Sequence, residues 1–193
     1  DFFETRGEYD ALRLAELAKE WKRPAIIKAQ GNEYQFMNSL KNYPGNQYIL
    51  PLSFPDAQDV ENPLDASNVS LSEMKHWELA PSNPAAFAKN QIPFAFTTSG
   101  LKPGEDAFAA VRLAMQYGLP YSTALAAWTT VPAGMLGLQS SIGTLEKGKL
   151  AHFIIVSDSL FLENSKIQEI YQFFKGSIVV AHHAPFDMGF LAC

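Results

Sequence analysis

The sequence predicts an α/β fold with a parallel sheet. Short runs of β-branched and aromatic residues alternate with longer segments of helical periodicity, and this alternation is typical of right-handed βα units. The 193 residues are 47% hydrophobic and 18% charged, which suits a globular protein with a sizeable core. The segment from Gly143 to Val156 is a further indication, since two glycines there frame a charged turn that leads into an apolar run.

Four strands are predicted from short runs rich in β-branched or aromatic residues. Three of them precede residue 100, and the fourth follows the glycine turn: residues 25–29, 48–54, 93–98 and 150–156. The polar segment 56–68 contains proline and is predicted to be a loop. A loop of that length usually has a function or wraps a surface.

The first predicted helix runs from Glu8 to Arg23. Apolar residues recur on it at the i, i+3, i+4, i+7 spacing, which predicts one face turned toward a core: Leu14, Leu17, Ala18 and Trp21. Pro24 ends this helix. Asn32 and Gln35 have the spacing of a capping box and predict a second helix. That helix is expected to bury three residues: Phe36, Met37 and Leu40.

Further helices are predicted over residues 72–79, 83–90, 105–117 and 122–136. The third of these begins with acidic residues and presents three apolar side chains on one face: Phe108, Val111 and Met115. Gly118 and Pro120 stop it.

Composition excludes several classes of protein. The net charge is −5 and the 15 Lys and Arg are scattered, which argues against a dedicated nucleic-acid binder. No apolar run reaches the roughly 18 residues of a membrane span, so no membrane partner is expected. Cys193 is the single cysteine and leaves the compartment open. Since the chain begins with Asp1, we expect a processed or clipped fragment.

Two motifs carry a resemblance to a known family. The stretch from Gly143 to Val156 resembles the G-x-L-x-x-G-K-x-A-D signature of the amidohydrolase superfamily, with His152 where that family usually has Asp. The stretch from Thr130 to Leu138 resembles the T-x-x-P-A-x-x-L-G-L helix that precedes it in the same family. Over about residues 1–171 the chain therefore resembles the C-terminal half of an imidazolonepropionase-like member.

This resemblance implies the second half of a (β/α)8 barrel, over residues 1–140, and the start of a small β domain, over residues 141–173. The missing N-terminal barrel half would be its partner. The implied activity is metal-dependent hydrolysis of carbon–nitrogen bonds in small amide-type substrates. The alternative is a catalytically inactive scaffold or binding half of a larger protein.

Site residues are expected just after the strands, because reactive groups project from the carboxyl ends of barrel strands. These places are Gln30, the Ser53 region and Ser99. The family holds a zinc-type divalent metal with histidines and an aspartate, and Ser99 stands at the position of that aspartate. A neutral hydroxyl does not replace a carboxylate. We expect no cofactor in this chain, and a structural role for Ser99 rather than a nucleophile, because no histidine lies in its turn.

His76 is a weaker candidate, in a short helix after the long loop. A lone histidine without a partner at metal-ligand spacing more often is a partly buried residue satisfied by a neighbour. Asp59 and Glu61 form a carboxylate pair, but no strand precedes them. We interpret them as a solvated loop pair.

The tail, residues 174–193, is predicted to form a strand, a turn and a helix. Residues 174–192 resemble the second motif of DEDD-type proofreading exonucleases such as the DNA polymerase III epsilon subunit, with His183 in place of the usual Asn. The resemblance implies that Asp187 is a magnesium or manganese ligand and the only route to a nucleic-acid partner. The three other carboxylates are not identifiable. Alternatively, Ser177–Ala181 is another strand of the β domain.

Overall fold

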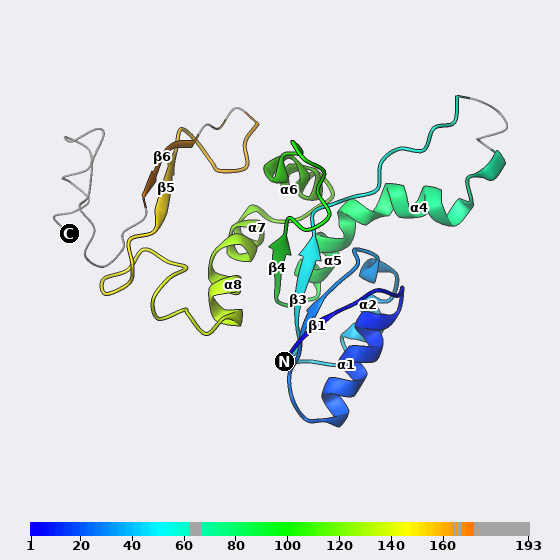
Figure 1. Cartoon of the computed structure of the whole chain (residues 1–193), viewed down its shortest axis with the longest axis horizontal. Coiled ribbons are helices and arrows are strands. Elements are labelled where there is room, and N and C mark those ends of the chain that lie inside the picture. Colours follow the sequence, from blue (N-terminus) through cyan, green and yellow to red (C-terminus); the bar gives the residue numbers. More distant parts are fainter. Residues whose placement is uncertain (62–66, 164, 166, 172–193) are drawn as a thin grey trace.

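The computed structural model describes residues 1–61, 67–163, 165 and 167–171. Its main sheet has four parallel strands in the order β1-β2-β3-β4, and a second sheet pairs β5 with β6 in antiparallel fashion (Figure 1). The strands are β1 (Phe2–Glu4), β2 (Ile26–Lys28), β3 (Gln47–Pro51), β4 (Phe94–Thr97), β5 (Phe153–Val156) and β6 (Ile167–Tyr171). The predicted α/β class with a parallel sheet is confirmed.

Helices connect the strands of the main sheet. In chain order the helical elements are α1 (Asp10–Glu20), η1 (Glu33–Gln35), α2 (Met37–Leu40), α4 (Leu71–Leu79), η2 (Ala80–Ser82), α5 (Asn83–Lys89), α6 (Ala107–Gln116), α7 (Tyr121–Trp128) and α8 (Thr130–Met135). The predicted segment 122–136 is two helices, because the backbone leaves the helical region at Thr129, with φ −125° and ψ −77°.

β1 and β6 were not predicted. β1 is three residues long and lies at the start of the chain, so it shows no periodicity of its own. It forms because Phe2–Glu4 pair in parallel with Ile26–Lys28 of β2. That pairing brings the end of β1 beside the end of β2.

The core lies between the main sheet and the helices packed against it. Its centre is aromatic and aliphatic: Ile27, Tyr48, Leu50 and Phe87 are each at most 1% exposed. The Tyr48 and Phe87 rings meet edge to face at 5.0 Å, and Phe94 joins Phe87 at 5.9 Å. These ring contacts pack β3 and β4 against α5.

The face predicted for α1 is wrong in part. Ala11, Ala15 and Ala18 are the buried residues of this helix, whereas Leu17 is 37% and Trp21 54% exposed. Small side chains let the helix lie close to the sheet, so the face with the alanines is the one that packs against it. Leu14 is partly buried against the core, so among the four predicted residues only Leu17 and Trp21 lie on a more exposed side of the helix.

The predicted capping box at Asn32 and Gln35 is also wrong. Asn32 makes no side-chain cap, and the residues that follow it form the 3-10 turn η1. The short helix α2 begins only at Met37, where Met37 and Leu40 are buried as predicted. The fully buried Glu33 organises this segment instead, since its carboxylate accepts the N–H groups of Gln30, at 2.8 Å, and Gly31, at 3.1 Å. It also accepts the side-chain amide of Asn83 at 2.8 Å, which ties η1 to α5.

The glycine turn packs against α8. A Cβ on Gly143, whose φ is +99°, would lie 2.9 Å from the Cβ of Ala133 and 3.3 Å from the Thr129 carbonyl oxygen. Only glycine fits this approach, which explains the first glycine of the motif.

Within the described part of the chain, no helix has both the length and the apolar character needed to cross a membrane. The tail that carries Asp187 lies outside the described residues.

Candidate functional site

The carboxyl ends of the four parallel strands meet at one edge of the main sheet. Glu4 ends β1 and Lys28 ends β2, while Ser53 and Ser99 each follow two residues after β3 and β4. Two strand-end residues that sequence reasoning did not single out, Glu4 and Lys28, therefore lie beside one that it did.

Lys28 is the centre of this edge. Its Nζ lies 2.5 Å from Glu4 Oε1 and 3.1 Å from Ser99 Oγ, so one ammonium connects β1, β2 and the turn after β4. The Lys28 side chain is only 24% exposed, whereas that of Glu4 is 55% exposed. We refer to Glu4, Lys28 and Ser99 as the lysine cluster.

The lysine cluster is held by charge as well as by hydrogen bonds. The hydrogen bond from Lys28, and then its positive charge, lower the pKa of the Glu4 carboxyl. A group that already donates to Ser99 does not accept the proton of the serine hydroxyl, so this geometry places no base on Ser99.

The other strand-end residues have structural contacts. Gln30 donates from Nε2 to the Thr5 carbonyl oxygen at 2.5 Å and to Thr5 Oγ1 at 3.1 Å, which links the chain beyond β1 to the chain beyond β2. A Cβ on Gly100, whose φ is +95°, would lie 2.6 Å from Ser53 Oγ. Ser53 thus packs directly on the turn that carries Ser99.

The lysine cluster does not fit a divalent metal. Its one carboxylate is paired with Lys28, and the ammonium would repel a cation at the same place. Among the described residues, no group of three or more His, Cys, Asp and Glu side chains is arranged to hold a metal ion.

His76 contacts a different part of the structure. Its Nδ1 lies 3.2 Å from the Tyr34 hydroxyl, and the two rings stack with centroids 6.1 Å apart. This contact links α4 to η1. Asp59 and Glu61 are exposed in a loop, where Asp59 accepts the N–H of Glu61 at 3.1 Å.

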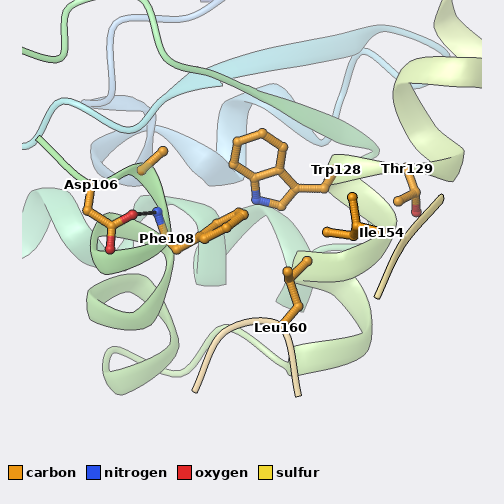
Figure 2. Close-up of a pocket in the computed structure, with 7 residues that line it drawn as sticks. Asp106, Phe108, Trp128, Thr129, Ile154 and Leu160 are labelled. Carbon is orange, nitrogen blue, oxygen red and sulfur yellow. Dashed lines mark hydrogen bonds between the residues drawn. The ribbon is translucent and has the colours of Figure 1, made fainter. Parts of the chain in front are cut away.

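A separate pocket of about 300 Å³ lies between α6, the α7–α8 junction and β5 (Figure 2). Phe108, Trp128, Ile154 and Leu160 supply its apolar walls. The carboxylate of Asp106 at its rim caps α6 by accepting the Phe108 N–H at 2.8 Å and pairs with Arg112 at 3.0 Å. None of the site residues predicted from the sequence lines this pocket.

The model of the amidohydrolase family matches residues 91–170, which include Ser99, the glycine turn, β4, β5 and all of β6 except Tyr171. The resemblance to the amidohydrolase superfamily is confirmed. A comparison with curated protein sequences gave no match.

Two solved structures show the same fold. One is an amidohydrolase from Thermotoga maritima MSB8, with a TM-score of 0.65 and 23% identity, matched over 89% of this chain and 41% of its own. The other is an uncharacterized protein, with a TM-score of 0.55 and 12% identity over 91% of this chain and 50% of its own. The chain thus spans half or less of the length of these two structures.

Proposed function

We propose that this chain forms the second half of a (β/α)8 barrel in an amidohydrolase-type hydrolase that acts on carbon–nitrogen bonds of small amides. The observation that carries this proposal is the family match over residues 91–170, which begins just before the last strand of a four-stranded parallel sheet. Residues 1–140 would be the barrel part, and residues 141–173 the segment that enters a small β domain.

In this proposal the lysine cluster binds substrate and leaves metal binding to the rest of the protein. An ammonium has three protons to donate, and Glu4 and Ser99 accept two of them in the structure. The third is suited to a carbonyl oxygen. Lys28 would thus orient an amide at the carboxyl edge, which is where barrel enzymes place their chemistry.

The second candidate function is a catalytically inactive scaffold or binding half. The position of Lys28 favours it, because the ammonium occupies the edge at which the family's metal ligands would converge. A third candidate function is an exonuclease in which Asp187 is a metal ligand. Asp187 lies outside the described residues, so this candidate stays a prediction.

The test uses the complete gene product, purified without chelator. Metal content and the hydrolysis of a panel of small amides are measured for the wild type, for Lys28→Met and for Lys75→Met, an exposed lysine on α4 that serves as the control. Hydrolysis that falls at least about tenfold with Lys28→Met alone supports the substrate role. Absence of both metal and hydrolysis in the wild type would select the scaffold.

The 193-residue chain by itself is expected to hold no stoichiometric transition metal. A near-unit metal content that disappears with His76→Ala would contradict this expectation and make His76 a ligand.

A further inference from the structure

The pocket between α6, the α7–α8 junction and β5 is separate from the lysine cluster, because none of the three residues of that cluster lines it. In Figure 2 the rings of Phe108 and Trp128 lie on one side of the pocket, and Ile154 and Leu160 lie on the other. Its volume is about 300 Å³. Apolar cavities of about 150 Å³ already take up benzene, so this pocket has room for one aromatic ring and a short chain.

Two aromatic rings form one wall of the pocket. The Phe108 and Trp128 rings meet edge to face, at 72° and with centroids 5.8 Å apart, and the Trp128 ring lies 6.1 Å from that of Phe96 on β4. These contacts hold the two rings in place on α6 and α7. Because the faces of aromatic rings carry a negative potential, such a wall attracts a cation as well as an apolar group.

Among the described residues that line the pocket, Asp106 alone is charged. Its side chain is 55% exposed. Its Oδ1 accepts the Phe108 N–H at 2.8 Å and its Oδ2 accepts a hydrogen bond from Arg112 at 3.0 Å, so the carboxylate is held at the rim. Each carboxylate oxygen has a second lone pair. Asp106 therefore has capacity for a further donor, and its negative charge favours a cationic one.

We propose that this pocket binds an arylalkylamine, a primary amine joined by a short chain to an aromatic ring. The ring lies between Trp128 and Leu160, and the ammonium group donates to the Asp106 carboxylate. An anionic ligand would be repelled by Asp106, and a neutral ring would leave the free lone pairs of the carboxylate unused. This site stands apart from the proposed hydrolysis at the carboxyl edge of the main sheet.

The experiment titrates the full chain with three probes that share a phenyl ring and differ in charge. Phenethylamine is a cation at neutral pH, phenethyl alcohol is neutral and hydrocinnamate is an anion. Nitrogen-15 NMR follows the indole N–H signal of Trp128, with Trp21 and Trp77 as internal references because they are exposed and do not line the pocket. We expect a saturable shift of the Trp128 signal alone, with the amine bound at least about threefold more tightly than the alcohol and the anion bound most weakly.

Asp106→Asn tests the carboxylate, because asparagine removes the charge but keeps an oxygen that can cap α6. This variant should bind phenethylamine about threefold or more weakly and phenethyl alcohol as the wild type does. The matched control is Asp10→Asn, since Asp10 also accepts a backbone N–H and pairs with an arginine, but on α1. It should leave both affinities unchanged.

Ile154→Trp tests the cavity from a wall that is 40% exposed, so the larger side chain can enter the pocket. Binding of the amine and of the alcohol should both be lost. Leu150→Trp is the control, because Leu150 is 44% exposed and does not line the pocket.

Two results with the wild type would overturn the proposal without any variant. Equal affinity for phenethylamine and phenethyl alcohol would exclude an amine site, and the absence of a saturable shift at Trp128 would exclude a ligand site in this pocket. Unchanged amine binding in Asp106→Asn would contradict the role of the carboxylate. None of these measurements uses hydrolysis, so their outcome is independent of the proposed function.

Discussion

At the scale of single residues, Lys28 decides the chemistry of the strand ends. It pairs with Glu4 and donates to Ser99, and this arrangement gives the edge a cation that is both partly buried and fixed in position. A serine beside an ammonium is a hydrogen-bond partner rather than a nucleophile. The lysine cluster therefore favours binding over covalent catalysis.

Lys28→Met is expected to raise the pKa of Glu4 toward its ordinary range, because the hydrogen bond and the charge that lower it are both removed. The pair stabilises the fold above the pKa of the unfolded carboxyl, and the benefit is lost as pH falls through the lowered pKa of the folded state. The stability difference between wild type and variant should thus shrink in acid.

Carboxyl titration by NMR measures this directly. Glu73 is the internal control, since the hydrogen bonds that lower its pKa come from Ser70 and are independent of Lys28. An unchanged Glu4 titration in Lys28→Met would show that the pair does not persist in solution.

Glu33 is the second residue with a large expected effect. Glu33→Ala would leave the N–H groups of Gln30 and Gly31 and the Asn83 amide without their acceptor in a buried place. We expect a loss of roughly 3 kcal/mol or more in urea denaturation. Glu61→Ala, at an exposed loop position, should stay within about 0.5 kcal/mol of the wild type, and a similar loss in both variants would contradict the role of Glu33.

At the scale of elements, the stability of α4 depends on the capping box at its N-terminus. None of its residues is buried, but Ser70 and Glu73 form a complete capping box, in which Ser70 Oγ accepts the Glu73 N–H at 3.2 Å and Glu73 accepts the Ser70 N–H at 2.8 Å. The contact between His76 and Tyr34 then holds this helix to η1.

Ser70→Ala should weaken α4 locally by about 1 kcal/mol, because the first-turn N–H loses its acceptor while little packing compensates. Hydrogen exchange of residues 71–79 should therefore quicken and the global midpoint hardly move. Ser72→Ala, an exposed position within the same helix, is the control. A large fall of the global midpoint with Ser70→Ala would mean that α4 is part of the cooperative core.

At the scale of the whole molecule, the main sheet and the small sheet are built on different parts of the chain. The four parallel strands lie within residues 1–97, and β5 and β6 follow the glycine turn. The interpretation of residues 174–192 as a motif of another family stays a prediction, and under it the apolar residues of this tail would suit a different sheet.

Deletion of residues 174–193 is therefore expected to shift the thermal midpoint only slightly. The loss in the free energy of unfolding should stay well below the 2 to 5 kcal/mol or so that truncation of a large core residue costs. One aspartate does not assemble a two-metal site, so we expect no nuclease activity on single-stranded DNA. A collapse of stability would instead make Ser177–Ala181 an integral strand. Magnesium- or manganese-dependent release of nucleotides that Asp187→Ala abolishes would establish the exonuclease reading.

Local signals in the sequence were sufficient for the α/β class, for most helices and for four of the strands. The apolar spacing of Phe108, Val111 and Met115 correctly predicted α6, with Val111 fully buried. The glycine turn correctly predicted that a strand, β5, follows it. This prediction needs only local information, because the positive φ at Gly143 favours glycine at that position. These features depend on neighbours along the chain.

The tertiary structure alone decided which residues share the candidate site. Lys28 and Ser99 are 71 positions apart, and Glu4 ends a strand that exists only because β2 lies beside it. It also decided that α1 buries its alanines and exposes Trp21. The physical reason is the same in each case. Periodicity in the sequence shows that a helix or strand has an apolar and a polar face. Which element packs against each face is decided by strands and helices that are far away in the sequence.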